Sequence, residues 1–230
     1  MILKKGIIIL LYNIYNPILI QKYMRFWLIP FSKEYKYISS KEEIISKRFN
    51  SKKGALYRFS RGYLRLCLSK VLGISSKDIP ILSLPGQPPI LPKKFGYISM
   101  SHSKDSLFLG WSLKRIGVDI ENNSRNINLQ RLLKSKWFKD EIKKISYIDE
   151  NNLRLEILKI WVIKEALIKS HFGSIIEDYD KWIIDFDNLI AKHKKLEIYR
   201  YIVNDRIKDW TIGLAYEDSF EYKSGLVEIL

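Results

Sequence analysis

The chain has 230 residues, 47% of them hydrophobic, so it is long enough to bury a core and is not an intrinsically disordered protein. Its single cysteine, Cys67, excludes an intramolecular disulfide framework and, because it lies in an apolar run, is expected in the core. The formal net charge of +15 favours anionic partners, which include nucleic acid, a membrane surface, a phosphorylated cofactor or an acidic protein.

An apolar run, KKGIIILLYNIY at residues 4–15, opens the chain. It is too short to span a bilayer, and it lacks the small-residue cleavage site of a secretory signal. We interpret it as a leading strand or another buried segment. The single cysteine fits a reducing compartment, so we expect a soluble, cytoplasmic protein that does not bind a membrane.

Two helices are predicted after this run. Ser40 followed by Glu43 is the pattern of a capping box, and it predicts a helix that continues to about Phe49. A second helix is predicted over residues 55–72, with Gly73 as a natural C-cap.

Three arginines recur along the second predicted helix at spacings of three and four residues. Arg58, Arg61 and Arg65 therefore share one face of it. Taken alone, this pattern is typical of a basic stripe that is exposed to solvent.

Five of the seven prolines fall within residues 80–92, which we interpret as an ordered, extended loop. Apolar runs at residues 107–111 and 116–121 follow, and we interpret them as the two strands of a hairpin. The tight turn between them is the predicted boundary between an N-terminal half, residues 1–113, and a C-terminal half, residues 114–230.

The C-terminal half is predicted to be helical from residue 129 to about residue 171. Residues 196–203 and 209–217 then resemble a closing antiparallel hairpin, with its turn at residues 204–206. Helices mixed with antiparallel strands, without regular alternation, predict an α+β fold.

The first motif with chemical potential is GVDIE, residues 117–121. In a strand, Asp119 and Glu121 project to one face, and the apolar residues between them project to the other. Two adjacent carboxylates require water or a cation to neutralise them, and oxygen ligands suit Mg²⁺. Taken alone, the motif is more typical of a solvent-exposed strand end.

The second motif is WVIKEALIKS, residues 161–170. On a helix, Glu165 and Lys169 are neighbours at i and i+4, and they could form a surface ion pair. The surrounding residues are strongly apolar, which equally favours a position facing a cleft. In that case Glu165 would be a third carboxylate for a metal, and Lys169 would meet phosphate oxygens.

The third motif is SMSHSKD, in which His102 lies between Ser101 and Ser103. Serine and histidine side chains can hold phosphate or ribose oxygens, and an imidazole can also act as a base. No histidine pair occurs at i+3 or i+4, which argues against a zinc site. The sequence also lacks a P-loop and a dinucleotide-binding glycine fingerprint.

In order, an arginine-bearing helix, G-x-P, S-H-S, G-V-D-x-E and W-x-x-K-E-A-x-x-K resemble the motifs of the 4′-phosphopantetheinyl transferases of the two-domain Sfp type. The resemblance extends from about Ser40 to the LAYE segment. It implies two similar α+β halves, each a small antiparallel sheet packed with helices, with coenzyme A in the cleft between them. The implied reaction moves the 4′-phosphopantetheine arm of coenzyme A to a serine of an acyl or peptidyl carrier protein. It requires a divalent cation, Mg²⁺ or Mn²⁺, and releases 3′,5′-ADP from a monomeric enzyme.

The resemblance also implies roles for the acidic and basic residues of the C-terminal half. Asp119, Glu121 and Glu165 look like the metal ligands, and Lys169 looks like the phosphate-side lysine that stabilises the transition state or the leaving group. Glu141 matches the glutamate that acts as general base for the carrier serine. Glu165 or a metal-bound water is the competing base.

The residues that would contact coenzyme A come mainly from the N-terminal half and are Arg58, Arg61, Gln87, Ser101, His102, Lys164 and Lys169. One of them departs from the family pattern, which often has G-K-P where this chain has Gly86-Gln87-Pro88. Glutamine can donate a hydrogen bond to phosphate but has no charge, and Lys93 or Lys94 could compensate.

A carrier-docking surface is the expected role of a segment after residue 121. Its apolar and basic residues, which could instead belong to the core, are Leu132, Leu133, Lys136, Trp137 and Phe138. Two other functions compete with phosphopantetheinyl transfer. The charge and the aromatic content fit a nucleic-acid-binding protein, and carboxylates with lysines also fit a Mg²⁺-dependent phosphoesterase. We expect neither nucleic acid nor membrane as a partner.

Overall fold

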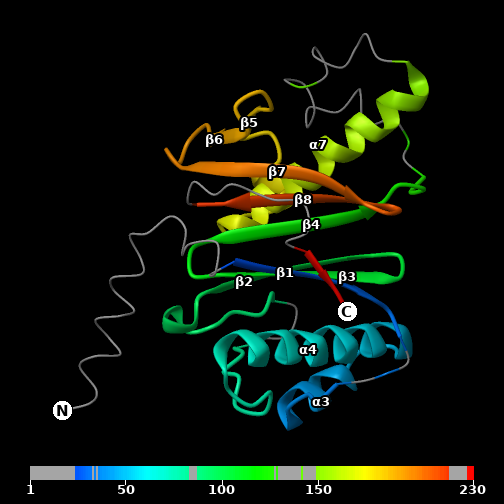
Figure 1. Cartoon of the computed structure of the whole chain (residues 1–230), viewed down its shortest axis with the longest axis vertical. Helices are drawn as coiled ribbons and strands as arrows, with labels where there is room; N and C mark the ends of the chain where they lie inside the picture. Colours follow the sequence, from blue (N-terminus) through cyan, green and yellow to red (C-terminus); the bar gives the residue numbers. More distant parts are fainter. Residues whose placement is uncertain are drawn as a thin grey trace, which may run out of the picture.

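The computed structural model describes residues 24–32, 34, 36–82, 87–126, 128, 141, 149–217 and 227–230. Within them the chain forms two sheets, each covered by a long helix, which confirms the predicted α+β class (Figure 1). The apolar run at residues 4–15 and the expected docking segment at residues 132–138 lie outside the described residues.

The first sheet has the strand order β2-β3-β1-β9. It contains β1 (Met24–Pro30), β2 (Tyr97–Ser103), β3 (Ser106–Ser112) and β9 (Val227–Ile229). β3 pairs antiparallel with both β1 and β2, whereas β9 pairs parallel with β1. The last strand of the chain therefore returns to the sheet that the first described strand belongs to.

The second sheet is antiparallel throughout and has the strand order β4-β8-β7-β6-β5. Its strands are β4 (Ile116–Asn122), β5 (Trp182–Asp185), β6 (Ile190–His193), β7 (Tyr199–Ile207) and β8 (Trp210–Tyr216). All seven residues of β8 are buried, as expected for a strand paired on both edges and covered by a helix.

The closing hairpin predicted from residues 196–217 is confirmed as β7 and β8. Its turn lies at residues 208 and 209 rather than 204–206, because β7 continues to Ile207 and Lys208 takes up the positive φ of 54° that reverses the chain.

The other predicted hairpin, between residues 107–111 and 116–121, is wrong. Both strands exist, as β3 and β4, but β3 is central in the first sheet and β4 pairs only with β8. Both edges of β3 are already occupied, so residues 113–115 carry the chain from one sheet to the other. Because β9 also returns to the first sheet, a domain boundary at residue 114 remains a prediction.

Two helices precede β2 in the chain: the longer one covers the first sheet, and the shorter one packs against the longer (Figure 1). In α3 (Ser40–Ser46) the capping box is formed by Ser39 and Glu42, one position before the predicted pair, and the helix ends before Phe49. The helix α4 (Ser51–Leu72) begins four residues earlier than predicted because Asn50 caps it, and it ends at Gly73 as predicted. Gly73 has a φ of 66°, which a residue without a Cβ adopts at little cost.

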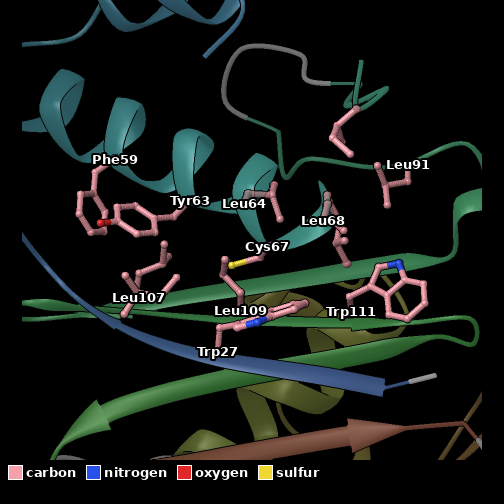
Figure 2. Packing of buried hydrophobic residues seen from close by; sticks show 13 residues of the cluster. Trp27, Phe59, Tyr63, Leu64, Cys67, Leu68, Leu91, Leu107, Leu109 and Trp111 are labelled. Carbon is pink, nitrogen blue, oxygen red and sulfur yellow. The ribbon is translucent and has the colours of Figure 1, made fainter. Parts of the chain in front are cut away.

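The core beneath α4 is apolar and closely packed (Figure 2). Leu64, Cys67 and Leu68 of the helix meet Trp27 and Leu109 of the sheet, and all five are buried almost completely. Burial raises the pKa of Cys67 to about 12, so its thiol is an apolar filler and not a nucleophile. This confirms its predicted place in the core.

The helix α7 (Glu150–Ser170) covers the second sheet and is the described part of the helical region predicted over residues 129–171. A four-residue helix, α8 (Ile175–Asp178), follows it. No described helix is both long enough and apolar enough to cross a membrane.

Two glycines allow α7 to approach the second sheet closely. A Cβ atom at Gly117 of β4 would overlap the carbonyl oxygen of Ala166, and one at Gly213 of β8 would overlap that of Val162. The backbone of α7 therefore lies directly on these two strands. This contact brings Glu165, next to Ala166, beside the acidic end of β4.

Candidate functional site

A row of serines on β2 joins the two sheets. Ser101 Oγ donates a hydrogen bond to Asp119 Oδ1 at 2.5 Å, and Ser103 Oγ donates one to Glu121 Oε2 at 2.7 Å. The second pair lies two residues after the first on both strands, so the serines of β2 and the carboxylates of β4 stay in register. Both predicted carboxylates therefore project from β4 toward β2, as the strand alternation indicated.

Serines of the same row also satisfy the edge of β4 that faces β2, where none of the described strands pairs with it. The backbone N–H of Val118 donates to Ser99 Oγ at 3.0 Å, and that of Asn122 donates to Ser103 Oγ at 3.3 Å. An unpaired buried N–H would be costly. Hydroxyl groups thus replace a backbone ladder at the junction of the two sheets.

The carboxylate of Asp119 is the centre of the site. It is 4% exposed, and its Oδ1 accepts hydrogen bonds from Ser101 and from Lys169 Nζ, the latter at 2.7 Å. Its Oδ2 is buried and has no hydrogen-bond partner among the described residues. A buried, unpartnered carboxylate oxygen is costly unless a ligand completes its coordination.

Glu165 lies next to this centre on α7 and is 7% exposed. Its carboxylate accepts no hydrogen bond from the described residues. Burial, followed by the charge of Asp119, raises the pKa of Glu165 to about 7, although Lys169 opposes this shift. The predicted pair Glu165 and Lys169 is therefore not a surface ion pair, because Lys169 binds Asp119 instead.

These carboxylates fit a divalent cation. Asp119, Glu121 and Glu165 are oxygen ligands, which hard cations such as Mg²⁺ prefer. The unpartnered Oδ2 of Asp119 and the raised pKa of Glu165 both indicate negative charge that the protein alone does not neutralise. These three residues would hold the ion, with waters or substrate oxygens at its remaining positions.

Glu141 and Lys164 form a buried ion pair next to this group. Lys164 Nζ lies 3.0 Å from Glu141 Oε1, and the two side chains are 2% and 5% exposed. Lys164 also donates to the carbonyl oxygen of Tyr179 at 3.3 Å. In this structure Lys164 points into the protein, so its contact with a cofactor and the role of Glu141 as base both remain predictions.

The three arginines of α4 do not form the exposed basic stripe that their spacing suggested. Arg65 is buried, and its Nε lies 2.7 Å from the carboxylate of Glu42, also buried. Arg58 pairs with Glu43 at 2.5 Å. Arg61 is buried too, with its guanidinium 4.9 Å from the ring centre of Tyr57. Arg65 is therefore a structural residue, and only Arg61 borders the cavities described next.

Two adjoining cavities lie along β2. The larger, of about 770 Å³, is mainly apolar, and Lys169 lies in its wall with Leu82, Pro89, Ile98, Met100 and Phe172. The smaller, of about 370 Å³, is lined by residues that include Lys53, Tyr57, Arg61 and His102. Gln87, Pro88, Pro89 and Met100 border both.

The cavities bring together several residues predicted to contact coenzyme A: Arg61, Gln87, His102 and Lys169. Ser101 and Lys164 do not line either of them. Burial, reinforced by the charge of Lys169, lowers the pKa of His102, so this imidazole is neutral at neutral pH and can both donate and accept. Lys53 was not singled out from the sequence, although it lies two turns before Arg61 on α4.

A second polar cluster, which the sequence did not reveal, lies at the end of α7. His171, Asp178 and His193 place their polar atoms within 4.8 Å of one another, as a metal site would require. However, His193 Nδ1 accepts two backbone N–H groups, so Nε2 carries the hydrogen and faces Asp178 Oδ1 at 3.4 Å. This hydrogen bonding accounts for His193 without a cation. The two histidines are 22 positions apart, which is why helical spacing missed the cluster.

Comparison with known proteins identifies one part of the chain. Residues 115–218 match the 4′-phosphopantetheinyl transferase superfamily. No curated protein matches the sequence. The matched segment runs from the start of β4 past the end of β8 and contains Asp119, Glu121, Glu165 and Lys169, whereas β1, β2, β3 and α4 lie outside it. Residues 115–218 therefore contain a domain of the 4′-phosphopantetheinyl transferase superfamily.

Proposed function

We propose that the protein is a Sfp-type transferase that moves the 4′-phosphopantetheine arm of coenzyme A to a serine of an acyl or peptidyl carrier protein. The single observation that supports this most is the contact of Lys169 with Asp119, beside Glu165, at the wall of the larger cavity. All three residues lie within the segment that matches the superfamily.

In the proposed reaction, the carrier serine oxygen forms a bond to the phosphorus that bears the pantetheine arm. The bond from that phosphorus to the bridging oxygen breaks, and 3′,5′-ADP leaves. Mg²⁺, or Mn²⁺, held by Asp119, Glu121 and Glu165, would supply charge neutralisation at the pyrophosphate. Lys169 would donate hydrogen bonds to the same phosphate oxygens as negative charge develops on them.

The proton of the carrier serine needs an acceptor. Glu141 is our first candidate, and the Lys164 ammonium 3.0 Å away balances its charge inside the protein. Glu165 is the second, because a carboxylate whose pKa is raised to about 7 is suited to accept a proton near neutral pH. A cation bound to Glu165 would compete with that role, which favours Glu141.

The two cavities suit the two ends of coenzyme A. The mainly apolar larger cavity would hold the pantetheine arm and end at Lys169. The smaller would hold the nucleotide, with Arg61, His102 and Lys53 facing its phosphates. Gln87 lies where the two cavities meet and would donate a neutral hydrogen bond in place of the usual lysine. Ser101 would act indirectly, by holding Asp119.

The net charge of +15 supports both partners, since coenzyme A carries several phosphates and an acidic carrier would be attracted to a basic surface. We propose that the protein acts as a cytoplasmic monomer, with fatty-acid, polyketide or nonribosomal-peptide carriers as the substrate class. Nucleic acid is not part of the proposed function.

Intact-mass measurement of an apo carrier protein tests the proposal. The carrier is incubated with this protein, coenzyme A and Mg²⁺, with EDTA added to a parallel sample. A mass gain of one phosphopantetheine arm that EDTA and Asp119→Asn both abolish is the expected result. If no member of a panel of fatty-acid, polyketide and peptide carriers gains mass, the transferase assignment is wrong.

A further inference from the structure

Asp119, Glu121 and Glu165 together form what we call the acidic group. Arg125, three residues beyond the end of β4, pairs with one of its members. Its guanidinium forms an ion pair with Glu121 Oε1 and lies 5.0 Å from the ring centre of Trp161, one turn before Glu165 on α7. Its side chain is 40% exposed, whereas that of Glu121 is only 14% exposed. The Arg125 side chain is thus more open to solvent than the carboxylate with which it pairs.

Other contacts fix the backbone that carries this arginine. The N–H of Arg125 donates to the carbonyl oxygen of Asn122 at 2.9 Å and closes a turn. Arg154 of α7 then donates to the carbonyl oxygens of Asn123 and Arg125, the latter at 2.8 Å. The turn is therefore anchored to the same helix that carries Glu165, which fixes the backbone from which the Arg125 side chain extends.

This arrangement leaves Glu121 with both oxygens engaged. Oε1 pairs with Arg125, and Oε2 accepts the hydrogen bond from Ser103. Asp119, in contrast, has an unpartnered oxygen. A divalent cation could approach Asp119 and Glu165 directly, but binding to Glu121 would require it to displace the guanidinium or the serine. The guanidinium is the easier to displace, because it is partly exposed and like-charged with the cation.

We infer that Arg125 competes with the divalent cation for Glu121 and thereby sets the metal affinity of the protein when no substrate is bound. The inference rests on the proposed function for the identity of the three ligands. An arginine suits this role because its guanidinium stays charged at every physiological pH. Its stacking on Trp161 would keep it close to the site after displacement.

Titration with Mn²⁺, with free Mn²⁺ followed by electron paramagnetic resonance, tests the role without coenzyme A or carrier. Arg125→Gln should bind Mn²⁺ about fivefold more tightly than wild type, as expected for the loss of one competing, partly exposed ion pair. Arg48→Gln removes the same charge from an exposed position at the end of α3 and serves as the control, with a much smaller change. The Mn²⁺ affinity of Arg125→Lys, which keeps the charge without the planar guanidinium, should lie between those of wild type and Arg125→Gln.

An Arg125→Gln affinity equal to or weaker than that of wild type overturns the inference, as does an equal gain in Arg48→Gln, which would indicate a long-range charge effect. The carrier-protein assay separates this failure from failure of the proposed function. Tighter Mn²⁺ binding without any transfer would leave the inference standing and reject the transferase assignment. Transfer to the carrier together with an unchanged Mn²⁺ affinity of Arg125→Gln would support the transferase assignment and overturn the inference.

Discussion

Removing the charge of Glu165 tests the electrostatics of the acidic group directly. In the metal-free protein, burial and the charge of Asp119 raise the pKa of Glu165 from 4.5 to about 7. In the unfolded chain the carboxyl group ionises as the pH rises through 4.5, whereas in the folded protein it stays protonated until about pH 7. The free energy of unfolding therefore falls across this interval, and the full loss is present above pH 7.

The loss amounts to about 3 kcal/mol, because a tenfold change in proton affinity corresponds to about 1.4 kcal/mol. Glu165→Gln has no ionisable group and escapes this loss. The stability of the variant relative to wild type should therefore rise by about 2 to 3 kcal/mol between pH 5 and pH 8. The exposed fraction of Glu165 is only 7%, so solvent screening reduces this value little.

Urea unfolding in EDTA, followed by tryptophan fluorescence at several pH values, measures the change. Glu156→Gln is the matched control, since Glu156 is on the same helix but forms a partly exposed ion pair with Lys159. A gap between Glu165→Gln and wild type that stays constant from pH 5 to pH 8 would refute the electrostatic reasoning. When Mg²⁺ replaces EDTA, wild type should be stabilised more than Glu165→Gln at pH 8.

Three further changes have defined outcomes. Lys169→Ala should lower the rate of transfer by roughly a hundredfold or more with an unchanged circular dichroism spectrum, and a near-normal rate in a steady-state assay would remove Lys169 from the mechanism. Lys164→Ala leaves Glu141 as an unpaired buried charge and should lower the free energy of unfolding by about 3–5 kcal/mol, whereas the double variant Lys164→Met/Glu141→Leu should recover much of it in the same denaturation experiment. Gly117→Ala should separate α7 from β4 and weaken Mn²⁺ binding, and an unchanged affinity would show that the close contact does not position the ligands.

Local signals predicted the features of this protein that depend on nearby residues. Gly73 ends α4 because a left-handed residue is needed there, and this requirement is visible in the sequence. The alternation of β4 placed Asp119 and Glu121 on one face, and helical spacing placed Glu165 near Lys169. These inferences needed only the period of a strand or a helix.

Features set by distant partners could not be predicted in this way. The spacing of the α4 arginines shows that they share a face. The burial of Arg65 depends on distant partners, which are Glu42, 23 residues earlier, and the carbonyl oxygens of Ser76 and Ile79. Likewise, β3 and β4 looked like a hairpin because they are adjacent in the chain. Instead, β3 forms a hairpin with β2, which directly precedes it in the chain, and its other edge pairs with β1. The partner of β4 is β8, and both β1 and β8 are far away in sequence.

The serine row of β2 has a consequence for the segment that matches the superfamily. Residues 115–218 contain all three proposed metal ligands, yet Ser101 and Ser103, which fix the orientation of two of them, lie outside this segment. The backbone N–H groups at the edge of β4 that faces β2 also depend on serines of β2 for their hydrogen-bond partners. The orientation of Asp119 and Glu121 therefore depends on both sheets together. Expression of residues 115–218 alone should therefore give a protein that binds Mn²⁺ more weakly than the full chain, and an equal affinity would show that the serines are dispensable for the site.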